Sequence, residues 1–494
     1  MYFSIIIVVV LLYLFFLFLL FYGRYFCAFV NASPRNIYTY NKEVLIPVIL
    51  PIKNEEVSLF EKFVKNWSFT DKRFLLVIID DSTESYFNDY INILIKNTNT
   101  YPKKEYINNS QILHIKNVLY IKRHIKRSGK GTAINFAIDV LKKLNYKFEA
   151  FATYDIEWRV DFTNILKGYN IIHNSKNIAF VQFRRKTINP SLFAMFSDLF
   201  FDFIQTAREV LNEPVMYAGS CALINYSIFQ KLGGFKDHIV EDAEFTVRCY
   251  LSNFKGKYLY EIVDYGENLP GDFNAAINTF YRWIYGGLLL SFQYSIPIIN
   301  SKLSVKEKLS LVYMLNCGFS YMFTVTLSLV NVFLSIYPLP ISISYLEYFL
   351  ISFLPLTHLI LSFTIYYIII KKLQYKINPF VIYIFGWGID ILFFAALIKV
   401  VLRLPEKRRV TKKVGKEKVR VYFLFIYLFF FIILSYNILL FVEYQAIIGL
   451  IIYTIWLLSC ILFILYMISP RIYMMTASQS EKMKITASAE ENKL

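Results

Sequence analysis

Cysteine is scarce in this chain and follows no pattern. The 494 residues include five cysteines, and no two of them have C-x-x-C spacing. The scattered positions of the five cysteines argue against a zinc site and against a disulfide framework. Charged residues are also few, at 18%, whereas 56% of the chain is hydrophobic. This composition is too apolar for an ordinary soluble protein and predicts several membrane spans beside a folded domain.

Acidic residues are outnumbered by basic ones. The chain has 53 Lys and Arg against 36 Asp and Glu, a formal net charge of +17. A compact basic stripe with interleaved aromatic residues is lacking, which argues against a nucleic-acid partner. In a membrane protein such an excess usually lies in cytoplasmic loops, beside anionic lipid headgroups. We therefore expect membrane lipids, and no nucleic acid, among the partners.

The first apolar run lacks a basic start and an A-x-A cleavage pattern. It covers Tyr2–Tyr22, about the ~20 residues needed to cross a bilayer. We therefore predict an uncleaved transmembrane anchor over residues 1–24. Arg24 and the basic domain that follows place the C-terminal end of this anchor in the cytosol.

Residues 43–274 alternate between apolar runs of strand length and helix-like segments. This alternation predicts an α/β domain with a mostly parallel sheet that is covered on both faces. Ligands of such sheets bind beyond the carboxyl ends of the strands. The predicted strands are Val44–Leu50, Phe74–Ile79, Val118–Ile121, Phe148–Tyr154 and Ile178–Phe183.

The rest of the chain returns to a membrane-like composition. We predict an interfacial region over 275–308, in which Ala275–Ile299 forms an amphipathic helix, and a disordered tail over 469–494. Transmembrane helix pairs are expected over 309–370 and 421–468. Their spans are Leu309–Tyr337, Tyr345–Ile370, Val421–Phe441 and Ala446–Ile468.

The apolar run 379–402 lies between two basic segments. The lysines at 371–372 and the loop 403–420, which has nine Lys and Arg against two acids, should both lie inside. An even number of crossings must then separate them. We predict that 379–402 is broken by Gly386 and Gly388 and lies in the interface or re-enters the membrane without crossing. A full span remains the alternative.

Acidic side chains follow the predicted strands. Asp155 and Glu157 come after one of them, and in an extended chain both would point to the same side. Two such carboxylates can share a divalent cation whose shell is completed by phosphate oxygens, although a solvated acidic turn is the alternative. Asp80 and Asp81 follow another strand. We expect these groups to meet at one edge of the sheet.

Six short motifs occur in a characteristic order. Together they resemble membrane-integrated family 2 glycosyltransferases, which include cellulose, hyaluronan and mannan synthases and ceramide glucosyltransferases. A basic loop at 410–415 resembles the V-T-x-K loop over the active site of these synthases, so the resemblance covers about residues 45–420. The motifs are Pro51-Ile-Lys-Asn54-Glu55-Glu56, Ile79-Asp80-Asp81-Ser82-Thr83, Gly129-Lys130-Gly131, Tyr154-Asp155-Ile156-Glu157, Val240-Glu241-Asp242 and Arg282-Trp283.

The resemblance implies a GT-A domain in the cytosol, held by a transmembrane bundle in the cell membrane, with a UDP- or GDP-hexose as donor. Mg²⁺ or Mn²⁺ would be held by Asp155 and Glu157, although the family pattern is D-x-D and the second acid here is a glutamate. Lys130, between two glycines at a helix start, would meet the donor diphosphate. The remaining donor contacts would be Pro51, Glu55, Asp80, Asp81 and Arg282.

The same resemblance assigns the catalytic base to Asp242. With a reference pKa of about 3.9 and a helix start beside it, this carboxyl should be ionised and able to accept the proton of the acceptor hydroxyl. The acceptor would also contact Gly219, Glu241 and Trp283. A simple acidic helix start and an interfacial aromatic belt are the alternative interpretations of these motifs.

The chain departs from the family at Thr279. Processive synthases have Q-x-x-R-W, whereas this chain has Thr279 in place of the glutamine. Three functions therefore remain open: a β-polysaccharide synthase that also exports its product, a transferase that acts once on a lipid or lipid-linked acceptor, and a non-catalytic export or scaffold protein.

Overall fold

The computed structural model describes most of the central region and three C-terminal helices. The predicted anchor, most of the first helix pair, the 405–420 loop and the tail lie outside the described residues. These are 23–108, 110–124, 129–188, 191–267, 273–315, 360–375, 377–404, 421–443 and 447–468.

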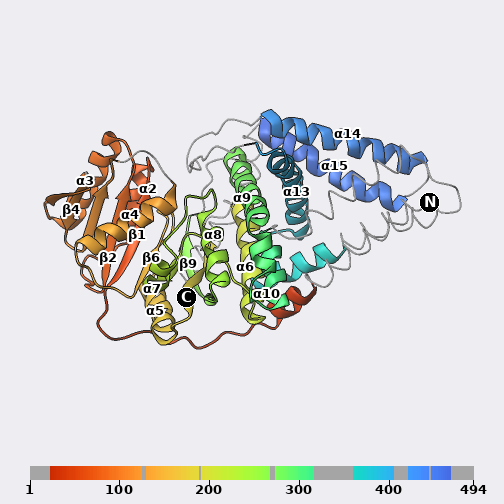
Figure 1. Cartoon of the computed structure of the whole chain (residues 1–494). Coiled ribbons are helices and arrows are strands. Elements are labelled where there is room, and N and C mark those ends of the chain that lie inside the picture. Colours follow the sequence, from red (N-terminus) through yellow and green to blue (C-terminus); the bar gives the residue numbers. More distant parts are fainter. Residues whose placement is uncertain are drawn as a thin grey trace, which may run out of the picture.

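The described residues form a nine-stranded mixed sheet in the order β3-β4-β5-β2-β1-β6-β8-β7-β9 (Figure 1). The pairings set β4 and β8 against the direction of all the other strands. The predicted α/β class and mostly parallel direction are thereby confirmed. The strands are β1 (Ile46–Ile52), β2 (Phe74–Asp80), β3 (Lys103–Ile107), β4 (Ser110–Ile115), β5 (Val118–Lys122), β6 (Ala150–Thr153), β7 (Ile178–Thr187), β8 (Ala222–Asn225) and β9 (Lys255–Gly266).

Both faces of the sheet are buried under helices. In β1, Val48 and Leu50 pack toward one core and Ile49 toward the other, because successive side chains in a strand point to opposite faces. The first core includes α2 (Val57–Lys65), α3 (Glu84–Thr98) and α5 (Phe162–Asn174). The second includes α4 (Lys130–Lys143), α7 (Tyr226–Lys231) and α8 (Glu241–Leu251).

The carboxyl ends of β5, β2, β1 and β6 meet at one edge, since these four neighbours are parallel. Asn54, in a left-handed conformation with φ of 51°, joins the ends of β1 and β2 there. Its N–H donates to Ser82 Oγ at 2.7 Å, and its side-chain oxygen accepts from Thr83 N–H at 2.9 Å. These hydrogen bonds hold the loops after β1 and β2 together, at the edge of the sheet where the predicted site residues lie.

Two helices connect the sheet to the C-terminal helices. One core cluster contains residues of α6 (Leu192–Val210), α9 (Phe273–Ile299), α13 (Pro379–Val401), α14 (Val421–Glu443) and α15 (Ile447–Ile468). Helix α6 also contacts β7 and β9, and α10 (Val305–Leu315) packs beside α9. Figure 1 shows α6 and α9 standing between the two parts of the molecule.

The predicted break in 379–402 is wrong, because α13 runs unbroken from Pro379 to Val401. The two glycines allow close packing instead. A Cβ on Gly388 would lie 2.2 Å from a ring carbon of Phe463 on α15, and one on Gly386 would lie 3.0 Å from Phe196 on α6.

Within the described ranges, one helix is long and apolar enough to cross a membrane, and it is α13. Of its most apolar window, 73% is buried inside the protein. A largely buried apolar helix is equally typical of the core of a folded domain. Whether 379–402 crosses, lies in the interface or re-enters therefore stays a prediction.

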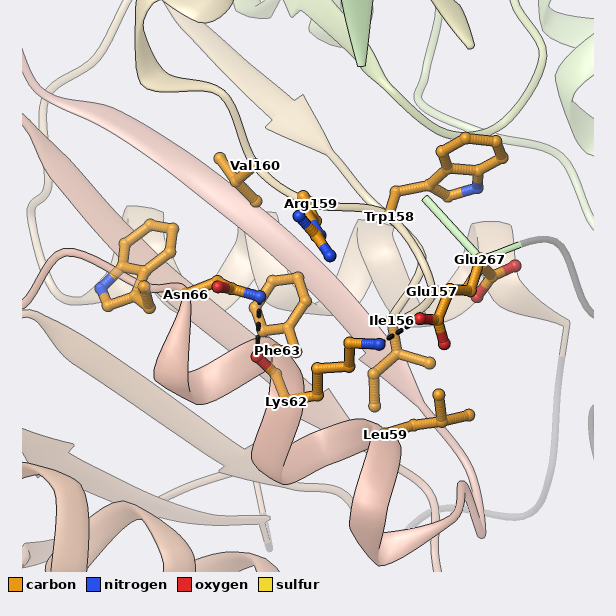
Figure 2. Close-up of a pocket in the computed structure, with 11 residues that line it drawn as sticks. Leu59, Lys62, Phe63, Asn66, Ile156, Glu157, Trp158, Arg159, Val160 and Glu267 are labelled. Carbon is orange, nitrogen blue, oxygen red and sulfur yellow. Dashed lines mark hydrogen bonds and ion pairs between the residues drawn. The ribbon is translucent and has the colours of Figure 1, made fainter. Parts of the chain in front are cut away.

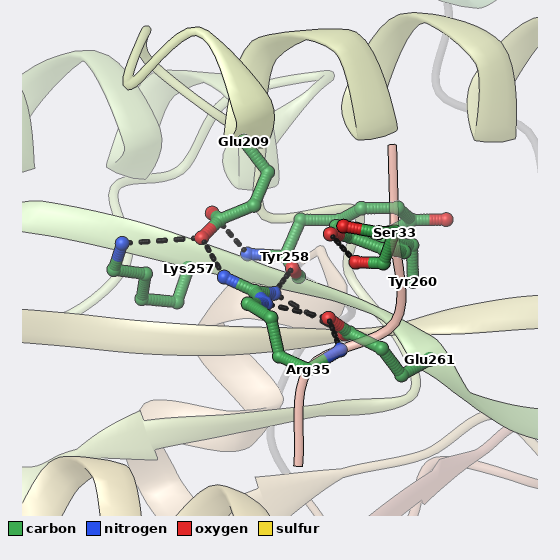
Figure 3. A network of polar contacts seen from close by, with 7 residues as sticks. All are labelled: Ser33, Arg35, Glu209, Lys257, Tyr258, Tyr260 and Glu261. Atoms are coloured by element: carbon green, nitrogen blue, oxygen red, sulfur yellow. Dashed lines mark hydrogen bonds and ion pairs between the residues drawn. The ribbon is translucent and has the colours of Figure 1, made fainter. Parts of the chain in front are cut away.

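The segment before β1 is tied to the other end of the sheet domain (Figure 3). Arg35 donates to Glu209 on α6 at 2.7 Å and to Glu261 on β9 at 2.5 Å, and Lys257 also pairs with Glu209 at 3.1 Å. The acidic side chains are nearly fully buried, whereas those of Arg35 and Lys257 remain partly exposed. The N-terminal segment therefore belongs structurally to the α6–β9 region.

Candidate active site at the carboxyl edge of the sheet

Lys130 is the first residue of α4 and the centre of the polar contacts at this edge. Its ammonium donates to Asp155 Oδ1 at 2.5 Å and to the carbonyl oxygen of Gly219 at 2.8 Å. Burial alone would lower the pKa of Lys130, but the carboxylates of Asp155, Glu241 and Glu157 together raise it. The lysine is therefore charged, and it joins three segments that are far apart in the sequence.

Asp155 and Glu157 do not lie in extended chain, which corrects the geometry we expected. Strand β6 ends at Thr153, and residues 155–158 form a turn in which Trp158 N–H donates to Asp155 O at 3.0 Å. Ile156 is buried and both acids are partly exposed, so they do point outward. Because of the turn, however, Asp155 and Glu157 face different parts of the protein.

Glu157 lines a small pocket on the α2 side of the turn (Figure 2). The walls include Leu59 and Phe63, and the rim carries Lys62, whose ammonium pairs with Glu267. Asp155 instead faces Lys130 at the start of α4. The effect of Glu157 on the Lys130 pKa shows that its carboxylate still acts on the same cation.

Glu241 and Asp242 lie in the first turn of α8, and the positive charge of Lys130 acts on both carboxyls. Burial, and then the charge of Asp242, raise the pKa of Glu241 to about 7, against the opposing effects of Lys130 and Arg282. Burial also raises the pKa of Asp242, although the Ala243 N–H that donates to its Oδ1 at 2.8 Å opposes this. The sequence-based expectation of an ordinary, low pKa for Asp242 is therefore wrong, because it assumed an exposed carboxyl.

Two glycines allow the acidic pair to approach the lysine. Gly219 has a φ of +77°, and a Cβ on it would lie 3.1 Å from Asp242 Oδ2. A Cβ on Gly131 would lie 3.0 Å from Glu241 Cγ. A larger side chain at either position would push the acids away. The structure thus brings together Lys130, Asp155, Gly219, Glu241 and Asp242.

Asp80 is placed differently from the prediction. Its side chain is fully buried, and its oxygens accept from Ser82 N–H and Tyr120 Oη, each at 2.7 Å, and from Lys122 Nζ at 3.2 Å. With these three partners inside the protein, Asp80 holds the ends of β2 and β5 together. Of the two aspartates, Asp81 is the one with a partly exposed carboxylate, which pairs with Arg123.

Pro51 and Glu55 lie at the end of β1, between β2 and β6. Pro51 pairs in register with Ile79, and the main-chain oxygen of Glu55 accepts a 2.6 Å hydrogen bond from the Tyr90 hydroxyl. Both residues are partly exposed. They therefore border the same edge as Asp81 and Asp155.

Arg282 reaches the site from α9, and Trp283 follows it in the same helix. Arg282 lowers the pKa of both acids of the α8 turn, which places its charge near them. Trp283 is 38% exposed and packs its ring edge-on against Phe280, with centroids 5.4 Å apart. Thr279 donates its hydroxyl to the carbonyl of Ala275, one turn earlier in the same helix, at 2.8 Å.

Four site residues were missed from the sequence: Lys122, Arg123, Gln182 and Ser220. The first two end β5, and the parallel register that sets Asp80 opposite Lys122 would have revealed their ion pairs. No local signal distinguishes Gln182, because its bonds to the Gly219 loop join residues more than 30 positions apart.

The side chains that could bind a metal ion suit a hard divalent cation, but they are few. Asp155 and Glu157 supply carboxylate oxygens, which Mg²⁺ and Mn²⁺ accept. Among the described residues, no three His, Cys, Asp or Glu side chains gather in a way that could hold a metal ion. Phosphate oxygens of a bound donor would therefore have to complete the coordination shell.

Comparisons with known proteins agree with this geometry. Residues 155–371 match the family model described as glycosyl transferase family group 2. The resemblance to family 2 glycosyltransferases is thereby confirmed over this segment. It begins at Asp155 and includes the Gly219 loop, the acidic pair of α8 and the Arg282–Trp283 pair. No curated protein sequence matched the chain.

Solved structures with a similar fold include the mannosyltransferase PcManGT from Pyrobaculum calidifontis, in complex with GDP-Man and Mn²⁺. That alignment has a TM-score of 0.54 and 15% identity, and covers 81% of this chain and 99% of the other. A second similar structure is TarS of S. aureus, with a TM-score of 0.35, 13% identity, and coverage of 72% and 53%. The PcManGT alignment shows that the mixed sheet resembles the GT-A fold.

Proposed function

We propose that this protein is a metal-dependent, inverting glycosyltransferase that transfers a hexose from a nucleotide sugar. The observation that carries the proposal is the convergence of Lys130, Asp155 and the Glu241–Asp242 pair at the carboxyl edge of the sheet. Ligands of open α/β sheets bind at this edge. The family match over 155–371 supports the same conclusion.

The donor would lie across the ends of β1, β2 and β6. Pro51, Glu55 and Asp81 would contact the nucleoside, beside the buried Asp80, and Lys130 and Arg282 would contact the diphosphate. Asp155 and Glu157 would hold Mg²⁺ or Mn²⁺. When bound, this ion would neutralise charge on the leaving diphosphate.

Asp242 would act as the general base. The acceptor hydroxyl gives its proton to the carboxylate while its oxygen bonds to the anomeric carbon, and the bond from that carbon to the diphosphate oxygen breaks. Attack from the face opposite the leaving group inverts the anomeric configuration. A raised pKa brings the base closer to neutral pH, where proton transfer is most efficient. Gly219, Glu241 and Trp283 would surround the acceptor.

The test of the proposal is a donor screen on the full chain in detergent. UDP- and GDP-hexoses are offered with Mg²⁺ or Mn²⁺, and nucleotide release is measured. We expect release with at least one donor, its loss on EDTA treatment, and a fall of at least a hundredfold in Asp242→Asn, since a positioned base contributes about 10²–10⁴-fold. Asp89→Asn, on the exposed face of α3, is the matched control. Equal release from wild type and Asp242→Asn would contradict the proposal, and no release with any donor would favour the scaffold function.

For the acceptor, we propose a growing β-polysaccharide at the cytosolic membrane face, with export of the product. Transfer to a lipid or lipid-linked acceptor is the second candidate. Thr279 favours it, because its hydroxyl bonds within α9, where processive synthases place a glutamine. Product size separates the two: a ladder or high-mass glycan supports the first, and a single-sugar glycolipid supports the second.

A further inference from the structure

The side-chain amide of Gln182 lies fully buried in β7, beneath the loop that carries Gly219. Its oxygen accepts from Ala218 N–H at 2.8 Å. Its nitrogen donates to the carbonyls of Ser220 at 2.9 Å, Cys221 at 3.0 Å and Phe183 at 3.1 Å. One side chain thus bonds to both sides of Gly219.

The loop between these bonds has a backbone that needs support. Gly219 has a φ of +77°, and Cys221 has a φ of +52°. The left-handed conformation is uncommon for a residue with a Cβ and persists where the surroundings fix it. The bonds from Gln182 to Ser220 O and Cys221 O supply this restraint.

The loop in turn holds the donor half of the site. Gly219 O accepts from Lys130 Nζ at 2.8 Å, and Ser220 Oγ accepts from Asp155 N–H at 2.9 Å. Both the lysine placed for the diphosphate and the aspartate placed for the metal are therefore bonded to residues that Gln182 positions.

The same loop also meets the base half. Thr246 Oγ1 accepts from Tyr217 N–H at 3.0 Å and donates to the main-chain oxygen of Asp242 at 2.9 Å. Gly219 lies against the Asp242 carboxylate, since an added Cβ would be 3.1 Å from Oδ2. A shift of the loop would move the base relative to the metal ligand.

We propose that Gln182 is a positioning residue that sets the spacing between Asp155 and Asp242 through the 217–221 loop. It deepens the proposed function, on which its catalytic part rests. Gln182 is fully buried, and its amide bonds to main-chain atoms of Phe183 and of the 217–221 loop. Its effect should fall on kcat rather than on donor KM, because errors of about 1 Å in the placement of reacting groups cost about a hundredfold in rate.

Gln182→Met tests this role, because methionine fills a similar volume and has no amide. Asn117→Leu is the matched control. The Asn117 amide also donates to three carbonyls, those of Ser68, Phe74 and Asp71, but it precedes β5 at the opposite edge of the sheet. Both variants lose one side-chain amide and its main-chain bonds, so they separate a general loss of stability from a loss of positioning.

We expect kcat to fall by about tenfold to a hundredfold in Gln182→Met, with donor KM changed less than threefold, and to stay within twofold in Asn117→Leu. Hydrogen exchange of the purified full chains supplies a readout that does not need activity. Peptides covering 216–224 and 153–158 should exchange faster in Gln182→Met and should be unchanged in Asn117→Leu.

Each outcome decides one question. An active wild type with kcat of Gln182→Met within twofold would overturn the positioning role and leave the proposed function standing. Unchanged exchange in 216–224 and 153–158 would also overturn it. If the wild type transfers no sugar but exchange rises in both segments of Gln182→Met, the proposed function fails while the link from Gln182 to Asp155 stands.

Discussion

At the scale of single residues, burial decides which carboxylates hold the fold and which face a ligand. Asp80 and Asp81 are neighbours in one motif, yet the first is fully buried beside Lys122 and the second is partly exposed and pairs with Arg123. The sequence could not separate them, because the direction of each side chain depends on the strand that pairs beside it.

Asp80→Asn should destabilise the protein. The change leaves the buried Lys122 ammonium without its carboxylate, and breaking a buried ion pair in this way costs about 3–5 kcal/mol. Thermal or denaturant unfolding of the purified protein measures the loss. Glu61→Gln is the control, since its pair with Lys65 is exposed to solvent and should contribute little to stability. Equal unfolding midpoints for the two variants would contradict this assignment.

The acidic pair at α8 should make stability depend on pH. The pKa of Glu241 is about 7 in the folded protein and 4.5 as the unperturbed value, so ionisation destabilises the folded state. This cost is complete above about pH 7 and disappears as the pH falls toward 4.5. Glu241→Gln should therefore stabilise the protein at pH 8, by about 1–3 kcal/mol, and have little effect near pH 4.5.

Unfolding midpoints at both pH values test this sign. A variant that is less stable than the wild type at pH 8 would show that the Glu241 carboxylate is held by favourable partners rather than opposed by burial. Glu261→Gln is a useful comparison, because the Glu261 carboxylate is paired with Arg35 and its removal should destabilise the protein at pH 8.

At the scale of elements, the sequence predicted an extended chain at 155–157 and a broken helix at 379–402, whereas the structure has a turn and the continuous helix α13. The 155–158 segment turns because Trp158 N–H bonds back to Asp155 O, which alternation of side chains could not reveal. Helix α13 continues through Gly386 and Gly388 because its neighbours pack directly onto them. The turn is closed by a local main-chain bond, whereas in α13 contacts distant in sequence outweighed a local preference.

Gly388→Ala should destabilise the packing of α13 on α15. The added methyl would lie 2.2 Å from a Phe463 ring carbon, and overpacking of this kind typically costs about 1–3 kcal/mol. Thermal unfolding in detergent should show a larger loss than in Gly386→Ala, where the nearest atom lies at 3.0 Å. Adding Phe463→Ala to Gly388→Ala should relieve the clash, so a double variant no different from the sum of the single changes would count against this contact.

At the scale of the whole molecule, the sheet domain and the C-terminal helices share one core through α6 and α9. We propose that the protein is integral to the cell membrane with its sheet domain in the cytosol, because the 403–420 loop has nine Lys and Arg against two acids and should lie on the same side. The predicted anchor at 1–24 precedes the sheet domain and the predicted helix pair at 309–370 follows it. Together they would place the carboxyl edge of the sheet just beneath the bilayer.

A topology reporter inserted within 405–418 tests this arrangement. We expect a cytosolic signal, matching a reporter placed in the 99–102 turn of the sheet domain. An external signal at 405–418 would show that 379–402 crosses the membrane, and would contradict the proposed interfacial or re-entrant position. An external signal at 99–102 would place the donor site on the wrong side for a cytosolic nucleotide sugar.

The sequence by itself determined the α/β class, the strands around the site and the identity of Lys130, Asp155 and Asp242 as its polar residues. Asp155 could be placed because parallel strands put their carboxyl ends, and the residues that follow them, at one edge, whereas Lys130 and Asp242 came from the resemblance of their motifs to family 2 glycosyltransferases. Only the tertiary structure decided that Asp80 is internal, that burial raises the pKa of the α8 acids, and that Gln182 supports the Gly219 loop. These properties depend on burial and on pairing between distant segments, and no local pattern of residues specifies either.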